Sequence, residues 1–506
     1  MRDWLTHRVR ATPERTALVD AADGTAWSFA DLDEAVEETA ASLAGLGVGR
    51  DDHVCVLMEA RPAFVQLLFA VQRLGAVLVP LNARLAVPEL ARQVDAADVR
   101  LLVCGRETEA DAVAAADVPV VSVDDPVSPG DGSGEPPDTD DAAPVARLGT
   151  DRAAFEPAEW ALDDRLALVF TSGTTGDAKA VSLSMGNVLA SAGSSALRLG
   201  VLPDDRWLLC LSMYHMGGLS VPLRSARYGT TVVLHRGFDA DAVCRAIETD
   251  GVTGVSLVPT MLRRLLDAGL EAHSLRFVLL GGAPARAELL ERALERGVPV
   301  HPTYGMTETA SQVATATPEE AATHRGTVGH PLLETDVTVV GSDGEPLPPG
   351  ESGELVVAGP TVTDGYYDRP AATADAFGEY GFHTGDVGHQ DDAGRLWVQN
   401  RLDDRIVTGG ENVDPGEVVE ALRAHPDVRE VAVVGLPDDE WGERVAALVV
   451  ADGDVTASSL RTFCDGRLAG FKRPRTVEFA ASLPRTASGT VDRDAVRRQL
   501  RRVADV

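Results

Sequence analysis

Lysine is almost missing from this chain. Only Lys179 and Lys472 occur among 506 residues, so nearly all of the 46 basic side chains are arginines. Aspartate and glutamate number 78, which leaves a formal net charge of -32. A surface this acidic repels nucleic acid and anionic membranes, so neither is expected as a partner. Because molar salt shortens the screening length to about 3 Å, the composition favours a halophilic protein over an ordinary acidic one.

Cysteine and long apolar runs are scarce as well. The five cysteines are scattered and form no C-x-x-C pair, which argues against a disulfide framework and a zinc site. The most apolar region, 64–81, is interrupted by Gln66, Gln72, Arg73 and Gly75, so it is no membrane span. The N-terminus lacks an apolar signal core. These absences predict a cytoplasmic protein with reduced thiols.

The length suits roughly three structural units. Helical patterns alternate with short Val/Leu runs, which predicts an α/β fold of parallel-rich sheets flanked by helices. We expect a large N-terminal domain over 1–401, with a small β-rich subdomain from about 335 to 401. Residues 402–506, with two helix patterns and several short strands, predict a mobile α+β lid domain. The Pro, Gly, Ser and Asp of 124–144 predict an acidic surface loop.

Local patterns predict the main elements of the N-terminal part. Ser28 and Asp31 form a capping box that opens a helix to about Leu46. Strands are expected at 54–58, 76–80, 99–104, 166–170, 207–211, 230–234, 254–258, 277–280, 335–340 and 354–359. Further helices are expected at 62–73, 88–94, 217–226, 239–250, 260–268 and 285–296.

One of the two lysines ends a run of Ser, Thr and Gly, 171-TSGTTGDAK-179, directly after an apolar strand. Glycines let the backbone turn so that N–H groups point at an anion, and Lys179 adds a positive charge. The run is no Walker A loop, because G-x-x-x-x-G-K-[ST] cannot be laid on it. We interpret it as a phosphate-binding loop, with an ordinary turn as the alternative.

Four further stretches give this loop a context. They are 281-GGAPA-285, 303-TYGMTETASQ-312, 382-FHTGDVG-388 and 400-NRLDDRIVTGGENVDPGEVVEAL-422. With TSGTTGDAK they follow the order and spacing of the adenylate-forming superfamily, which includes acyl-CoA synthetases, nonribosomal adenylation domains and luciferases. The resemblance covers nearly the whole chain.

The resemblance implies a two-step reaction. A carboxylate attacks the α-phosphate of ATP, giving an acyl-adenylate and pyrophosphate, and a thiol, usually that of coenzyme A, then displaces AMP. Mg²⁺ would assist, because it prefers carboxylate and phosphate oxygens. The implied class is therefore an AMP-forming acid–thiol ligase whose partners are ATP, CoA and a small carboxylic acid. The sequence leaves the oligomeric state open, a homodimer included.

The resemblance also assigns site residues. The catalytic set is Thr307, Glu308, His215 and Lys179, with Glu308 as the metal ligand. The implied ATP-binding residues are Thr171, Ser172, Gly173, Thr174, Thr175, Gly176, Lys179, Gly282, Ala283, Pro284, Tyr304, Gly305, Met306, Thr307, Asp386 and Arg401.

Substrate and CoA are assigned in the same way. The candidate acyl-pocket residues are His215, Gly217, Gly218, Ser311 and Gln312. Asp403 lies at the family's hinge between the two domains, and Gly409 and Gly410 would line the CoA tunnel.

The C-terminal motif departs from the family. Relatives usually end in P-[RK]-T-x-S-G-K, whose lysine contacts the α-phosphate, whereas 484-PRTASGTVDR-493 has Thr490 there. Loss of one such charged donor costs on the order of 10²–10³ in rate. The enzyme could adenylate slowly, recruit Arg485, Arg493 or Lys472, or not adenylate at all. For Lys472 itself, the sequence favours a surface lysine of a strand over a catalytic role.

The acid is suggested by small similarities. MYHMGGLS, LLGGAPA, YGMTETASQ and GHPLLETDV together most resemble the o-succinylbenzoate–CoA ligases of menaquinone biosynthesis. Their aromatic dicarboxylate substrate calls for an apolar pocket with polar anchors for the second carboxylate. An aryl or medium-chain acyl-CoA synthetase, or a non-adenylating relative that binds nucleotide or acyl-CoA, is the alternative.

Overall fold

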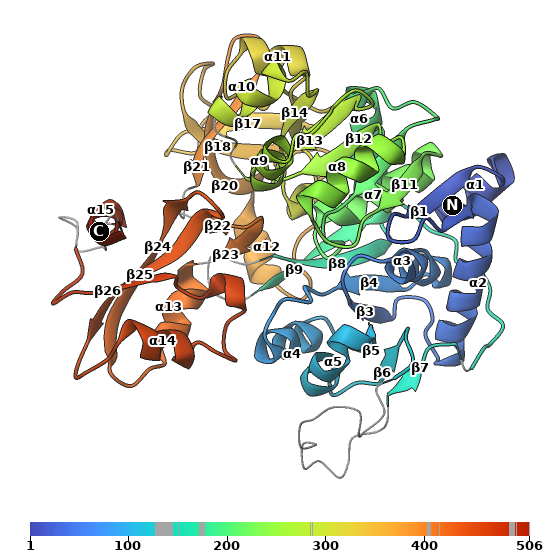
Figure 1. Cartoon of the computed structure of the whole chain (residues 1–506), viewed down its shortest axis with the longest axis horizontal. Helices are drawn as coiled ribbons and strands as arrows, with labels where there is room; N and C mark the ends of the chain where they lie inside the picture. Colours follow the sequence, from blue (N-terminus) through green and yellow to red (C-terminus); the bar gives the residue numbers. More distant parts are fainter. Residues whose placement is uncertain are drawn as a thin grey trace.

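The computed structural model describes residues 1–126, 145–149, 151–171, 178–283, 285, 287–401, 406–413, 415–484, 491 and 493–504. It shows the mixed α/β architecture expected from the sequence, with two large sheets, a smaller β unit and a C-terminal domain at one side (Figure 1). Of the expected acidic loop, only residues 124–126 are described. Asp124 there accepts two hydrogen bonds from the guanidinium of Arg61, at 2.8 and 2.9 Å.

A seven-stranded sheet carries the expected phosphate loop. Its strand order is β7-β6-β5-β3-β4-β8-β9, parallel except for β9, which runs antiparallel to β8. The strands are β3 (His53–Leu57), β4 (Val77–Pro80), β5 (Val99–Cys104), β6 (Val120–Ser122), β7 (Ala146–Arg147), β8 (Arg165–Thr171) and β9 (Lys179–Ser184). The helices are α2 (Phe29–Gly45), α3 (Pro62–Leu74), α4 (Val87–Ala96), η1 (Arg106–Thr108) and α5 (Glu109–Ala115).

A nine-stranded sheet, in the order β16-β15-β14-β13-β12-β10-β11-β1-β2, carries the other N-terminal motifs. The strands are β1 (Thr16–Asp20), β2 (Ala26–Ser28), β10 (Arg206–Leu209), β11 (Thr231–Leu234), β12 (Gly254–Leu257), β13 (Phe277–Leu280), β14 (Val300–Tyr304), β15 (Ala314–Thr315) and β16 (His330–Pro331). The helices are α1 (Trp4–Ala11), α6 (Met185–Leu199), α7 (Met216–Tyr228), α8 (Ala240–Thr249), α9 (Pro259–Asp267), α10 (Ala287–Glu295), η2 (Thr307–Thr309) and α11 (Pro318–Thr323).

The largest apolar cluster joins these two sheets. It includes Leu78 and Val169 from the first sheet, Trp207 and Val232 from the second, and Phe64 of α3 between them. Residues such as these bury most of their surface, which is the main favourable term in folding. The two sheets are therefore held as one body, and the strand ends that carry the motifs face a common space.

The remaining N-terminal elements form the expected small β unit. Its strands are β17 (Asp336–Val340), β18 (Gly353–Ala358), β19 (Phe377–Gly378), β20 (Gly381–Gln390) and β21 (Leu396–Arg401), with α12 (Pro370–Ala376) beside them. β20 pairs antiparallel with both β18 and β21, so it is the centre of this sheet. That places Asp386 of β20 opposite Arg401 of β21.

The C-terminal domain has its own sheet and apolar core. Its strands are β22 (Ile406–Thr408), β23 (Glu411–Val413), β24 (Val428–Asp438), β25 (Gly442–Ala451) and β26 (Thr476–Phe479). The helices are α13 (Pro415–Arg423), α14 (Ala457–Phe463), η3 (Gly470–Lys472) and α15 (Arg493–Ala504). The sequence predicted two helical patterns here. The third helix, α15, is dominated by arginine, and only Val496 and Leu500 of its described side chains enter the core.

Most local predictions are confirmed within one to three residues. Ser28 and Asp31 cap α2 reciprocally, as the capping box requires. All five cysteines are buried and unpaired. In the part of the chain that the structure describes, no helix is long and apolar enough to cross a membrane.

One expectation is wrong. Lys472 is not a surface lysine of a strand, because it lies in the short helix η3 and is only 7% exposed.

Candidate active site

Four site motifs follow the carboxyl ends of strands β8, β10, β13 and β14. In α/β sheets this is the edge at which ligands bind, because the loops there converge while the strands hold them rigidly. The four loops begin after Thr171, Leu209, Leu280 and Tyr304. The fold thus brings together residues that lie up to about 130 positions apart.

The phosphate-loop segment is closed by a hairpin. Thr171 at the end of β8 pairs with Lys179 at the start of β9, so the chain returns antiparallel directly after the loop. Residues 172–177 lie outside the described part of the chain. They include five of the predicted ATP-binding residues, namely Ser172, Gly173, Thr174, Thr175 and Gly176. Thr171 lines a cavity that Thr307 also lines.

Lys179, Glu308 and Tyr366 form a connected group. The ammonium of Lys179 lies 4.9 Å from the centre of the Tyr366 ring, a distance suited to a cation–π contact. The hydroxyl of Tyr366 lies 3.1 Å from Oε1 of Glu308, which is only 9% exposed. Sequence reasoning missed Tyr366; its only local signal is an aromatic pair after Gly365 in a chain poor in aromatics.

A tight loop presents Thr307. The short helix η2 ends at Thr309 and is followed by Ala310 and Ser311, whose φ angles are 48° and 114°. A Cβ on Gly305 would stand 1.7 Å from the carbonyl oxygen of Ser311, so only glycine fits there. This close approach folds the 305–311 segment back on itself and directs Thr307 into the cavity.

The expected nucleoside side of the site is assembled by Tyr304 and Asp386. The Tyr304 hydroxyl donates to Oδ2 of Asp386 at 2.8 Å, and Asp386 is 7% exposed. The side chain of Arg401 and the whole of Pro284 lie outside the described residues. Gly282 has a φ of 78°, and Ala283 follows it.

The segment before α7 presents His215. His215 is the residue before the helix, and Gly217 and Gly218 form its first turn. A Cβ on Gly218 would lie 2.2 Å from the carbonyl oxygen of Ser212, so this turn packs against its own preceding chain. The ring of His215 remains accessible and lines the cavity.

The other two candidate acyl-pocket residues differ in placement. Ser311 is half-buried at the turn described above. Gln312 is 1% exposed, and its amide donates to Oγ1 of Thr315 at 2.8 Å, while its Oε1 has no partner among the described residues.

Glu411 joins the two domains at His215. It follows Gly409 and Gly410 in the C-terminal domain, and its Oε2 lies 2.8 Å from Nε2 of His215. Arg84 lies 3.2 Å from its other oxygen. Burial favours the neutral form of Glu411, but His215 and Arg84 outweigh it and hold the pKa below its usual value. Sequence reasoning had singled out the motif of Glu411 but not this carboxylate.

Arg224 was also missed. It lies on α7, is 2% exposed, and donates from Nη2 to the hydroxyl of Ser191 at 3.0 Å. Ser191 donates in turn to the carbonyl of Ala310, next to Ser311. Nη1 of Arg224 has no hydrogen-bond partner among the described residues, and burial lowers the pKa of the guanidinium. A buried cation without a carboxylate partner is costly and is a strong indication of a ligand site.

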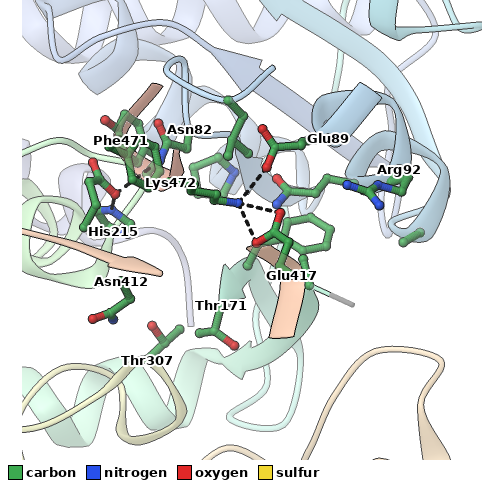
Figure 2. Close-up of a pocket in the computed structure, with 18 of the residues that line it drawn as sticks. Asn82, Glu89, Arg92, Thr171, His215, Thr307, Asn412, Glu417, Phe471 and Lys472 are labelled. Atoms are coloured by element: carbon green, nitrogen blue, oxygen red, sulfur yellow. Dashed lines mark hydrogen bonds and ion pairs between the residues drawn. The ribbon is translucent and has the colours of Figure 1, made fainter. Parts of the chain in front are cut away.

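One cleft between the domains is lined by Thr171, His215 and Thr307 of the N-terminal part and by Glu411 of the C-terminal domain (Figure 2). It holds about 1030 Å³ of space, including space open to solvent. Among the described residues, no three His, Cys, Asp or Glu side chains gather to hold a metal. Glu308 contacts the same tyrosine as Lys179, and one carboxylate suits Mg²⁺ bound mainly by phosphate oxygens and water.

Comparison with known proteins identifies relatives of this arrangement. The family profile "AMP-binding enzyme" matches residues 5–367, and "AMP-binding enzyme C-terminal domain" matches residues 417–490. A 2-succinylbenzoate–CoA ligase of Bacillus mycoides (strain KBAB4) is 39% identical over 508 aligned positions, covering 100% of this chain and 99% of the relative.

Solved structures of o-succinylbenzoate CoA synthetase from Bacillus subtilis are also similar. A double mutant bound to a product analogue, OSB-NCoA, has a TM-score of 0.89 at 35% identity, covering 98% of each chain. The complex with ATP and magnesium has a TM-score of 0.73 at 35% identity, covering 99% of each chain. Since identity and coverage are nearly equal for the two structures, the difference between their TM-scores reflects a difference in conformation. The present structure resembles the product-analogue complex more closely.

Proposed function

Because the chain belongs to the AMP-binding enzyme family, we propose that it ligates 2-succinylbenzoate to coenzyme A with ATP. In the first step a carboxylate oxygen attacks the α-phosphorus, the bond to the β-phosphate oxygen breaks, and pyrophosphate leaves. In the second step the CoA thiol attacks the acyl carbon, the thiol proton is lost, and AMP leaves. The full-length similarity to 2-succinylbenzoate–CoA ligases supports this substrate.

The observation that carries the proposal is Arg224. An acid with one carboxylate consumes that group in the reaction and leaves nothing to pair with a buried guanidinium. A dicarboxylate keeps its second carboxylate, which can take both hydrogen bonds of the arginine fork. Through Ser191, Arg224 is linked to the backbone of Ala310, next to Ser311 of the predicted acyl pocket.

The ATP-binding roles follow from chemistry at each position. Lys179 and the loop after Thr171 would hold the β- and γ-phosphates, and Thr307 would donate to the α-phosphate. Glu308 would bind Mg²⁺, as a hard carboxylate ligand. Asp386 would accept from the ribose hydroxyls, with Arg401 beside it. The adenine base would be enclosed by residues of two loops, namely Gly282, Ala283, Pro284, Tyr304, Gly305 and Met306.

The CoA side of the reaction would use the opposite face of the cleft. His215 would close the acyl pocket, and the backbone of Gly409 and Gly410 would line the path of the thiol. Asp403 would be the hinge between a domain ending at residue 401 and a lid beginning at 402. The rest of the acyl pocket would be formed by Gly217, Gly218, Ser311 and Gln312.

The decisive experiment compares acids. Pyrophosphate release and thioester formation are measured in molar KCl with ATP, Mg²⁺ and CoA, using 2-succinylbenzoate, benzoate or octanoate. Turnover confined to 2-succinylbenzoate supports the proposal. Faster turnover of benzoate or octanoate keeps the ligase and replaces the substrate by an aryl or medium-chain acid. ATP binding without turnover of any acid favours a non-adenylating relative.

The setting of the enzyme is part of the same proposal. The charge of -32 and the scarcity of lysine support a halophilic, cytoplasmic enzyme of haloarchaeal-type composition that acts in menaquinone biosynthesis. Its activity should rise with KCl from 0.1 M to the molar range, since screening relieves surface repulsion. Light scattering during that titration would show whether the enzyme is a homodimer.

A further inference from the structure

Lys472 is held by two carboxylates in the interior of the cleft (Figure 2). Its ammonium lies 2.7 Å from Oε1 of Glu89 and 2.9 Å from each carboxylate oxygen of Glu417. Glu89 is 3% exposed and Lys472 is 7% exposed. An ammonium has three hydrogen-bond donors, and here three carboxylate oxygens accept from it. All three ammonium donors of Lys472 are therefore paired within the protein and need no water.

The three residues come from two domains. Glu417 lies on α13 and Lys472 on η3, both in the C-terminal domain. Glu89 lies on α4 of the N-terminal part, and its Oε2 also accepts from the backbone N–H of Ala86 at 2.9 Å. If the domains separate, Lys472 and Glu417 stay together, and the contact between Glu89 and Lys472 is the one that breaks. Glu89 is thus the residue whose contact exists only while the domains are docked.

The chain just before Lys472 docks on the same surface. Ala469 is 2% exposed and packs within the apolar cluster of Leu85, Leu90 and neighbouring β-strand residues of the N-terminal part. The guanidinium of Arg84 lies 5.3 Å from the centre of the Phe471 ring. A short segment of the C-terminal domain, 469–472, therefore contributes both apolar and charged contacts to α4 and the loop before it.

A second contact crosses the interface in the opposite direction. Glu411 projects from the C-terminal domain to His215 and Arg84 of the N-terminal part, whereas Glu89 projects toward the C-terminal domain. Both contacts line the same cleft. Segment 469–472 and loop 409–412 are parts of one domain, so docking of the first fixes the second over the cleft.

We propose that Glu89 is a positioning residue that latches the C-terminal domain, through Lys472 and Glu417, in the arrangement used for thiol transfer. The proposal rests on the proposed function, because only a two-step ligase needs this arrangement for one step and not the other. Glu89 touches neither acid nor nucleotide in this role. It acts by holding loop 409–412 in place.

Glu89→Gln tests the latch with little change of shape, since the glutamine carbonyl can still accept from Ala86. Single-turnover assays with ATP, Mg²⁺ and 2-succinylbenzoate measure adenylate formation, and addition of CoA then measures thiol transfer. We expect thiol transfer to slow at least tenfold while adenylate formation changes less than twofold. Arg429→Gln breaks the exposed pair with Asp452 inside the C-terminal domain and should alter neither step. Equal loss in both steps would overturn the proposal.

A distance measurement tests the latch without catalysis. Dyes on Asp111→Cys of α5 and Ser458→Cys of α14 report the domain arrangement by energy transfer in the unliganded enzyme, since the native cysteines are buried. Glu89→Gln and Lys472→Met should each shift the population away from the docked distance. Unchanged transfer in both variants would overturn the latch. A shift in an enzyme that turns over no acid would leave the latch standing and reject the ligase function.

Discussion

Tyr366 and Glu308, which lie 58 residues apart in sequence, are joined by a hydrogen bond of 3.1 Å between the phenol hydroxyl and Oε1. The same ring lies under the ammonium of Lys179. One aromatic side chain therefore orients both the proposed metal ligand and the proposed phosphate-binding lysine.

Tyr366→Phe removes the hydroxyl and keeps the ring under Lys179. A hydrogen bond to a charged group contributes about 1.5–3 kcal/mol, so pyrophosphate release should slow by roughly 10- to 100-fold. The Mg²⁺ concentration for half-maximal rate should rise in parallel. Tyr367→Phe is the matched control, because that hydroxyl donates to Asp98 on the exposed surface. Equal effects of the two substitutions would contradict the role of Tyr366.

Arg224→Met exchanges a buried guanidinium for an apolar chain of similar length. Replacing a buried charge in this way is often neutral or stabilising, so Tm should stay or rise. The kcat/KM for 2-succinylbenzoate should fall by roughly 100-fold, since a bidentate charge-assisted contact is lost. The kcat/KM for benzoate should change far less. Arg227→Met, at an exposed position of the same helix, should leave kcat/KM unchanged for both acids.

Gly305→Ala places a methyl group into the carbonyl of Ser311. Overpacking of this kind costs about 1–3 kcal/mol of unfolding free energy, and here it also displaces Thr307. We expect a lower denaturation midpoint in urea together with loss of pyrophosphate release. Gly193→Ala, in α6 with no atom near the added Cβ, should instead stabilise by about 0.5–1 kcal/mol. A neutral Gly305→Ala would contradict the close packing of this loop.

Thr490→Lys restores the lysine of the family motif, in a segment that lies outside the described residues. If Thr490 meets the α-phosphate during adenylation, pyrophosphate release should accelerate, toward the roughly 10²–10³-fold that one charged donor supplies. Ala487→Lys places the same charge at the variable position of the motif and should have little effect. An unchanged rate in Thr490→Lys would count against the alignment of this motif.

The docked arrangement should depend on pH through Glu417. Burial raises the pKa of Glu417 to about 7, against the attraction of Lys472 and with the help of Glu89. Arg92 and Glu411 line the same cleft. Because Glu89 across the interface adds to this rise, docking takes up a proton, and its favourable contribution is lost as pH rises from about 4.5 through about 7. Energy transfer should show the fraction of docked enzyme falling as pH rises from about 4.5 to about 7. In Glu417→Gln this fraction should depend much less on pH.

Much of this molecule could be predicted from sequence because the patterns are local. Patterns of apolar residues predicted strands such as β3, β5 and β13 and helices such as α3 and α8, and the Ser28–Asp31 cap opened α2 where expected. The five ordered motifs predicted the two-step chemistry and the loops that carry it. Strand β9 was missed, because its alternation directly follows a loop rich in Ser, Thr and Gly and reads as its continuation.

The sequence by itself thus determined the fold class, the reaction type and the positions of the loop residues. Only the tertiary structure decided which distant side chains meet: Tyr366 with Glu308, Arg224 with Ser191, and Lys472 with Glu89. The physical reason is that burial and charge pairing depend on packing between elements far apart in the chain, which no local pattern records. Lys472 is the clearest case, because its neighbours in sequence predict an exposed residue and its neighbours in space remove it from water.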